Sequence, residues 1–151
     1  PLYSSAASDV YKRQDAKRLG ADEVLVSRDP AQMKAHANSF DFLLNTVPVS
    51  HDTNPYMSLL KRDATMCLVG VITELDPPLM GASVIFGRKH VTGSAIGGMA
   101  ETQEMMDFCA EHNIVSDVEV IDIKDVNHAW ERMAKNDVRY RFVIDMASLK
   151  A

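Results

Sequence analysis

Three short runs of this sequence place residues with ligand-binding potential directly after apolar segments. The runs span residues 45–48, 68–71 and 92–98. Each apolar segment predicts a β-strand, and ligands of open α/β sheets bind beyond the carboxyl ends of the strands. We therefore predict a ligand-binding site there, with the candidate residues Thr46, Val47, Gly70, Val71, Ser94, Ala95 and Ile96.

These residues offer hydrogen bonds and close backbone approach, not acid–base chemistry. A hydroxyl at a strand end, such as that of Thr46, can bond a ribose or nicotinamide group, or can merely cap the strand. Gly70 has no side chain, which lets a flat cofactor approach the backbone, although a turn would also favour glycine. Gly93 inside a predicted strand is typical of close approach by a ligand or another backbone, with a softened edge strand as the alternative. The next residue, Ser94, adds a hydroxyl.

No motif in the sequence supplies catalytic or metal-binding groups. The patterns GxGxxG, GxxxxGK[ST], CxxC and HExxH do not occur. The histidines share no metal-ligand spacing; they are His36, His51, His90, His112 and His128. The adjacent His51 and Asp52 could form a base with its orienting carboxylate, but a solvated loop pair is the preferred interpretation. We predict no catalytic residue and no metal ligand in this chain.

Alternating strands and helices must position the candidate residues. The predicted strands span residues 23–26, 40–47, 65–71, 90–96, 118–123 and 140–144. The predicted helices span residues 30–38, 55–61, 101–111 and 126–135, with a short helix ending at residue 86. Asp29 and Asn54 are the expected N-caps of the first two helices. Strands that alternate with helices predict an α/β fold with a parallel, doubly wound sheet.

Two of these helices are predicted to bury an apolar face. The inward side chains are Met105, Phe108 and Cys109 on the first, and Val126, Ala129, Trp130 and Met133 on the second. Trp130 is therefore interpreted as a core residue and not as a stacking platform. Cys67 and Cys109 lie in apolar elements and are expected to be buried free thiols, which fits a reducing cytoplasm.

Composition excludes several classes of partner. The 151 residues carry a formal net charge of -5, whereas nucleic-acid binding requires clustered Lys and Arg side chains. Hydrophobic residues make up 46% of the chain, yet no run approaches the roughly 18 apolar residues of a membrane span. We therefore expect a small-molecule ligand and no nucleic-acid or membrane partner.

Residues 1–14 do not continue the pattern that begins at Asp15. Their sequence, PLYSSAASDVYKRQ, resembles translated adapter read-through of the kind found at the ends of assembled sequences. The alternative is a native N-terminal helix with Ser8 as its cap. We predict a non-native leader at 1–14 and exclude it from the fold.

From Asp15 to its end, the chain resembles the C-terminal portion of the zinc-dependent, medium-chain alcohol dehydrogenases. It is most similar to their cinnamyl-alcohol-dehydrogenase-like branch of NADP-dependent aldehyde reductases. The residues that carry the resemblance lie at 17–22, 45–49, 56–61, 93–97 and 136–143. The last of these runs, NDVRYRFV, is especially specific.

The resemblance implies an oxidoreductase that transfers hydride between NADP(H) and a primary alcohol or aldehyde. Residues 15–98 would be the C-terminal part of the NADP-binding Rossmann domain, with its strands 3–6. Residues 99–151 would be the C-terminal return segment of the catalytic domain. The implied cofactor-binding residues are Thr46, Val47, Gly70, Val71, Ser94, Ala95 and Ile96, of which Ala95 and Ile96 would also edge the aldehyde pocket.

The same resemblance implies that the zinc ligands and the Gly-rich phosphate loop of the intact parent precede this segment. The chain would then be an inactive fragment of a cytoplasmic enzyme that forms a homodimer through the strand near residues 90–96. One alternative is a non-catalytic α/β module that self-associates through that edge strand. A second alternative is another doubly wound protein, such as half of a methyltransferase. It would need a Gly-rich loop, and the sequence shows no such loop. In the usual strand order, 3-2-1-4-5-6, strands 1 and 2 would be missing. We therefore expect strands 4–6 to stay together and residues 23–26, as strand 3, to be displaced or to slide against strand 4.

Overall fold

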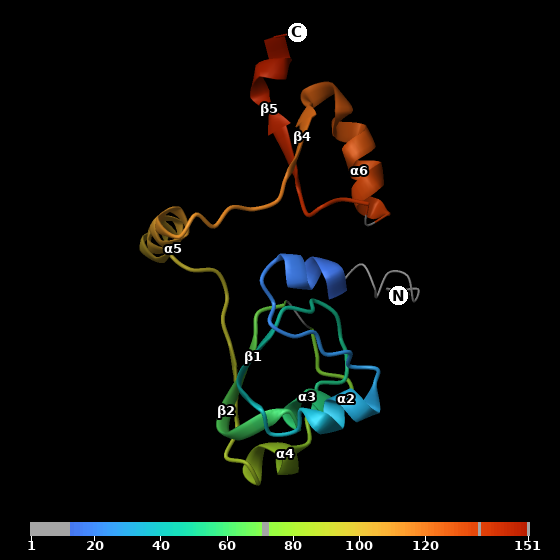
Figure 1. Cartoon of the computed structure of the whole chain (residues 1–151), viewed down its shortest axis with the longest axis vertical. Helices are drawn as coiled ribbons and strands as arrows, with labels where there is room; N and C mark the ends of the chain where they lie inside the picture. Colours follow the sequence, from blue (N-terminus) through green and yellow to red (C-terminus); the bar gives the residue numbers. More distant parts are fainter. Residues whose placement is uncertain (1–12, 71–72, 136, 151) are drawn as a thin grey trace. The chain divides into compact units, whose positions relative to one another are not determined.

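The computed structural model describes residues 13–70, 73–135 and 137–150, and the chain divides into two compact units between Ala95 and Ile96 (Figure 1). The boundary expected at residue 98, between a cofactor-binding and a catalytic domain, stays a prediction. The predicted leader falls outside the described residues except for residues 13 and 14, which are helical together with residues 15–18.

The first unit contains a parallel sheet and short helices. Its elements are α2 (Pro30–Ala35), β1 (Phe40–Asn45), α3 (Asn54–Met57), β2 (Leu60–Leu68), α4 (Gly81–Ile85) and β3 (His90–Gly93). The strand order is β1-β2-β3, and both pairings are parallel. These are the strands predicted at 40–47, 65–71 and 90–96, so the predicted α/β class with a parallel sheet is confirmed.

Residues 23–26 form no strand of this sheet, although a strand is predicted there. The N–H of Val26 donates instead to Gln32 Oε1 of α2 at 3.1 Å. Asp29 caps α2 as predicted and accepts hydrogen bonds from the N–H groups of Ala31 (2.9 Å) and Gln32 (3.2 Å). Hydrogen bonds from the backbone and then the side chain of Gln32 lower the pKa of Asp29.

The helix predicted at 55–61 is shorter than expected, because α3 ends at Met57. Its N-cap residue is Thr53, so the prediction that Asn54 caps this helix is wrong. The Asn54 side chain instead ties α3 to the loop before α4. Its Nδ2 donates to the Pro78 carbonyl at 3.1 Å, and its Oδ1 accepts from the Met80 N–H at 2.8 Å.

β2 begins at Leu60, which pairs with Phe40, and the ladder then becomes irregular before it resumes at residue 65. The irregular segment contains Asp63 in the left-handed region, with a φ of 63°. Its N–H donates to the Gly87 carbonyl at 3.0 Å, and its carboxylate accepts from Arg88 Nε at 2.6 Å. The hydrogen bond from Arg88 lowers the pKa of Asp63. This contact joins the irregular segment of β2 to the α4–β3 loop.

The core of the first unit is built by α3 and β2, with side chains from β1 and α4. Its buried residues are Met57, Leu60, Ala64 and Met66, and the partly buried residues around them include Leu43, Leu68, Leu79 and Val84. Cys67 is buried, as predicted. Thr53 is also buried, and its Oγ1 has no hydrogen-bond partner among the described residues.

The second unit contains α5 (Met99–Glu111), β4 (Glu119–Asp122), η1 (Ile123–Asp125), α6 (Val126–Ala134), β5 (Phe142–Asp145) and η2 (Met146–Lys150). β4 and β5 pair in parallel. Arg132 attaches α6 to this pair: its Nη2 lies 2.8 Å from Glu119 Oε2, and its guanidinium lies 4.8 Å from the centre of the Phe142 ring. The Arg139 N–H and then the Arg132 guanidinium lower the pKa of Glu119.

Several apolar side chains predicted to be buried are exposed. Ala129 of α6 is buried as predicted, but Trp130 is 65% exposed, so its interpretation as a core residue is wrong. On α5, Met105 and Phe108 are more than half exposed, and Cys109 is only partly buried. The helical periodicity is correct, but the described residues leave these faces uncovered.

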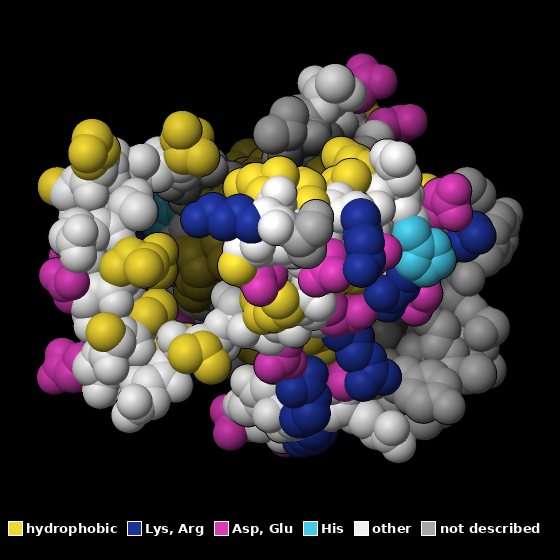
Figure 2. Space-filling model, turned by 90° about the horizontal axis from the view of Figure 1, so that it is seen from above, with side chains coloured by type: hydrophobic (Ala, Val, Ile, Leu, Met, Phe, Trp, Pro, Cys, Tyr) yellow, Lys and Arg dark blue, Asp and Glu magenta, His cyan; other side chains and the backbone are white. Residues whose placement is uncertain are grey.

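Charged side chains of both signs are interspersed on the face of the molecule that Figure 2 shows. Among the ion pairs of the described residues, Lys61 Nζ lies 2.7 Å from Asp41 Oδ2. The same view shows apolar side chains at the surface. Exposed apolar side chains of the first unit include Phe42 and Leu44 of β1, which are 54% and 55% exposed. Among the described residues, no helix has the length and apolar character needed to cross a membrane.

Candidate functional site

The three parallel strands of the first unit end in register. Asn45 of β1 lies opposite Leu68 of β2, and Leu68 lies opposite Gly93 of β3. The chain therefore leaves the sheet at one common edge after each strand. The structure brings together five of the predicted site residues there: Thr46, Val47, Gly70, Ser94 and Ala95. Val71 lies outside the described residues, and Ile96 belongs to the second unit, where it is 97% exposed.

Gly70 makes room for the backbone of the loop that follows β1. A Cβ atom at Gly70 would lie 2.4 Å from the Val47 carbonyl oxygen and 2.6 Å from its carbon, closer than real Cβ atoms approach. The N–H groups of Val69 and Gly70 both donate to the Asn45 carbonyl, at 3.0 and 3.3 Å. The predicted reason for this glycine was cofactor approach or a turn. The structure shows a contact between two strand-end loops.

The Asn45 side chain holds the loop after β1 at two points. Its Oδ1 accepts a hydrogen bond from the Val47 N–H at 3.1 Å, and its Nδ2 lies 3.0 Å from His51 Nε2. His51 Nδ1 lies 2.7 Å from the Val49 carbonyl oxygen, which can only accept. These partners assign the proton to Nδ1 and leave Nε2 as the acceptor of the Asn45 amide.

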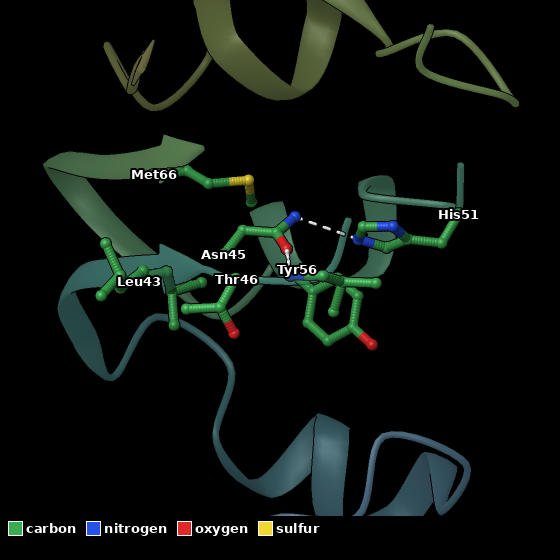
Figure 3. Close-up of a pocket in the computed structure, with 8 residues that line it drawn as sticks. Leu43, Asn45, Thr46, His51, Tyr56 and Met66 are labelled. Atoms are coloured by element: carbon green, nitrogen blue, oxygen red, sulfur yellow. Dashed lines mark hydrogen bonds between the residues drawn. The ribbon is translucent and has the colours of Figure 1, made fainter. Parts of the chain in front are cut away.

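A pocket of about 250 Å³ opens beside this loop. Its lining residues are Leu43, Leu44, Asn45, Thr46, Val47, His51, Tyr56 and Met66. Figure 3 shows the Asn45–His51 hydrogen bond, with the hydroxyl oxygens of Thr46 and Tyr56 directed away from it. The pocket is largely apolar, with a small number of polar groups, as small-molecule sites usually are.

His51 is a pocket residue that the sequence interpretation missed. It is half-buried and bonded to Asn45, so the prediction of a solvated loop pair with Asp52 is wrong for His51. Asp52 is exposed, and its Oδ1 accepts from the N–H and the side-chain amide of Asn54, both at 2.9 Å. The segment between Asn45 and His51 is a loop with no helix or strand repeat, so no sequence pattern predicts the contact.

Ser94 and its neighbours are held by the end of β2. The Ser94 N–H donates to the Leu68 carbonyl at 3.1 Å. A Cβ at Gly93 would lie 3.3 Å from the same carbonyl oxygen, so the predicted close backbone approach at this glycine is observed. The Ser94 hydroxyl lies 3.3 Å from the Ala95 carbonyl oxygen. Both residues are exposed and accessible to a ligand.

Comparison with known sequences decides the family. The profile of the zinc-binding dehydrogenases matches residues 5–111, which is more than half of the chain. This chain belongs to the zinc-binding dehydrogenase family. The family predicted from its residues is thereby confirmed, and the match begins at residue 5, within the predicted leader.

Individual relatives of this dehydrogenase chain agree with that assignment. It is 51% identical over 138 residues to an aldehyde reductase of Escherichia coli (strain K12), covering 91% of this chain and 40% of the relative. A solved cinnamyl alcohol dehydrogenase of Sorghum bicolor matches with a TM-score of 0.81 and 45% identity, covering 95% and 40%. A solved CAD of Helicobacter pylori, complexed with NADP(H), matches with a TM-score of 0.69 and 33% identity, covering 91% and 39%. The chain thus spans about 40% of the length of these relatives.

The family name raises the question of zinc. In the part of this dehydrogenase chain that the structure describes, no group of three or more His, Cys, Asp or Glu side chains could hold a metal ion. The polar groups at the strand ends are hydroxyls, a carboxamide, an imidazole and backbone amides, a set that suits a hydrogen-bonding ligand. The described residues therefore do not fit a zinc site.

Proposed function

We propose that this chain is the part of an NADP(H)-dependent alcohol dehydrogenase or aldehyde reductase that receives the nicotinamide end of the cofactor. The observation that carries the proposal is the register of the three strand ends, which gathers Thr46, Gly70 and Ser94 at one sheet edge. Such an edge is where open α/β sheets bind nucleotides. The family membership and the NADP(H) complex of the Helicobacter pylori relative support the same cofactor.

In this proposal each residue at the edge has a binding role. The exposed Thr46 hydroxyl bonds the ribose or carboxamide, while Ser94 and the backbone of Ala95 contact the nicotinamide. Val47 and Gly70 shape the loops around it, and Val71 and Ile96 complete the set of candidate residues. The cofactor supplies or accepts the hydride when bound. The chain's own residues bind and orient it, and Ala95 edges the pocket for a primary alcohol or aldehyde.

The complete enzyme, by which we mean the longer protein to which this chain is proposed to belong, would carry zinc on residues outside the described part of this chain. We place that enzyme in the cytoplasm, in agreement with the free thiols of Cys67 and Cys109.

Replacing Thr46 with valine in the complete enzyme should weaken NADPH binding by a factor of about two to about ten, the value of one neutral hydrogen bond. The shape of the side chain is kept, so the loss reports the hydroxyl alone. The measurement is a fluorescence titration with NADPH, together with KM for NADPH. Thr65→Val, in the middle of β2, is the matched control and should leave both constants unchanged. Equal constants for Thr46→Val and the unmodified enzyme would remove Thr46 from the site.

We also propose a homodimer formed through β3. This strand lies at the edge of its sheet, and all four of its residues are exposed. Because the Ser94 N–H bonds to β2, alternation places the Val91 N–H on the free side of β3. Val91→Pro removes that donor and should raise the dimer dissociation constant at least about tenfold, as measured by sedimentation equilibrium. Val91→Thr keeps the donor and should remain dimeric; a monomeric unmodified enzyme would refute the proposal.

A further inference from the structure

A chain of hydrogen bonds fixes the shape of the loop that carries Thr46. The Asn45 carboxamide bridges the Val47 N–H and the His51 imidazole, and the imidazole in turn bonds the Val49 carbonyl. The loop from 45 to 51 is thus closed on itself by side chains. The Asn45 carbonyl is at the same time held by the N–H groups that follow β2. One residue therefore ties both strand ends together.

This arrangement works in one protonation state only. The Asn45 amide nitrogen donates, so it requires an unprotonated Nε2 on His51. A protonated imidazole has donors on both nitrogens and would face the Asn45 amide donor with another donor. Rotating the carboxamide to offer Oδ1 to His51 would turn the amide nitrogen toward the Val47 N–H, which then loses its acceptor. Protonation therefore breaks one of the two bonds of Asn45.

We propose that His51 is a positioning residue that, through Asn45, holds Thr46 and Val47 in the shape that receives the nicotinamide end of NADP(H), and that only its neutral form does so. The inference rests on the proposed cofactor site. His51 lines the same pocket as Thr46 and Val47. A change in the hydrogen bonds of His51 would therefore alter the surface that the ligand contacts. Neither His51 nor Asn45 takes part in hydride transfer.

The groups that face His51 come from α3, from β2 and from its own loop. From α3, the Tyr56 ring meets the imidazole edge-on, with centroids 6.4 Å apart. From β2, the pocket is lined by the apolar Met66. The neighbouring carboxylate of Asp52 is engaged by Asn54. The remaining residues that line the pocket carry no charge.

The test uses the complete enzyme and NADPH as the probe, with affinity measured between about pH 8 and about pH 5, the range in which an imidazole gains its proton. The affinity of the unmodified enzyme should fall toward acid pH. His51→Leu removes both bonds and should weaken NADPH binding about tenfold at pH 8. The affinity of this variant should not fall further toward acid pH. His51→Gln can accept from Asn45 and donate to Val49, so it should restore the affinity and flatten the pH profile.

Asn45→Asp supplies a signature that loss of packing would not produce. A carboxylate accepts from both the Val47 N–H and an imidazolium Nε2–H, while Nδ1–H keeps its bond to Val49. The protonated imidazole then becomes the fitting form. The pH dependence should therefore reverse: in this variant the affinity for NADPH should fall as the pH becomes alkaline. His128→Gln, an exposed histidine of α6, is the control and should leave the profile unchanged.

The outcomes separate the inference from the proposed function. If the unmodified enzyme fails to bind NADPH, both are overturned. If it binds NADPH and the His51 variants share its affinity and its pH profile, the inference alone is overturned. A loss in His51→Gln equal to that in His51→Leu would also overturn it, because the hydrogen bonds would then not be what matters. Restoration by His51→Gln together with reversal by Asn45→Asp supports it.

Discussion

Replacing Gly70 with alanine should destabilise the complete enzyme and remove most of its affinity for NADPH. The added Cβ would lie 2.4 Å from the Val47 carbonyl oxygen and 3.0 Å from the Pro48 nitrogen. Both atoms belong to the backbone and cannot rotate away as a flexible side chain would. We expect the free energy of unfolding to fall by about 1–3 kcal/mol, the usual cost of overpacking.

The loss of affinity at Gly70→Ala follows from the direction in which the loop must move. To relieve the contact, the Val47–Pro48 peptide must shift away from β2, and Thr46 moves with it. We expect NADPH to bind at least about tenfold more weakly. The displaced hydroxyl and the reshaped pocket should each reduce the binding free energy by about the value of one hydrogen bond or more. Fluorescence titration with NADPH and urea unfolding measure the two effects separately.

Gly81→Ala is a matched control for this substitution. No heavy atom lies within 4 Å of a Cβ built at Gly81, and the residue belongs to the helix α4. Alanine there reduces the freedom of the unfolded chain, so stability should stay the same or rise slightly. Equal behaviour of the Gly70 and Gly81 variants would show that the loop after β1 is free to move and that Gly70 has no special role.

The strand ends could be predicted from sequence because apolar runs, and the residues that end them, are local signals. The runs that end near Asn45, Leu68 and Gly93 form β1, β2 and β3, and their parallel pairing follows from the helices between them. The Asp29 cap is equally local, since its carboxylate bonds N–H groups two and three residues away. Such features depend on neighbours in the chain and survive without tertiary information.

The contacts that shape the pocket could not be predicted in the same way. The bond between Asn45 and His51 depends on the path of the loop, and Asp63 of β2 bonds Arg88, which lies 25 residues further along the chain. Asn54 has the residue type of a cap, yet it bonds Pro78 and Met80 instead. In each case a side chain with several possible partners takes one that local propensity does not indicate.

Burial failed as a prediction where an amphipathic face has no described partner. Trp130 and Phe108 lie on correctly predicted helices, but both are more than half exposed. Periodicity shows which face of a helix is apolar; it does not show what covers that face. A longer dehydrogenase that contains this chain would offer covering elements, in keeping with relatives of which the chain spans about 40%.

The 151-residue chain by itself should show no stoichiometric zinc and no aldehyde reduction, whereas the complete enzyme should show both. Among the described residues, no group of three or more His, Cys, Asp or Glu side chains could hold the metal ion that would polarise an aldehyde oxygen. Phe42 and Leu44 of β1 are also more than half exposed. We expect the isolated chain to aggregate or to remain partly molten, since those apolar faces stay in water.

Elemental analysis of the purified chain and an NADPH-oxidation assay with cinnamaldehyde test this expectation. The complete enzyme, assayed under the same conditions, is the positive control and should turn over. Size-exclusion chromatography and amide exchange test the folding part, because residues 23–26 lie outside the sheet and should exchange rapidly. Bound zinc in the isolated chain, or NADPH oxidation above a blank, would show that this segment holds catalytic groups of its own. A monomeric sample with slow exchange at 23–26 would show that the first unit is stable without further chain.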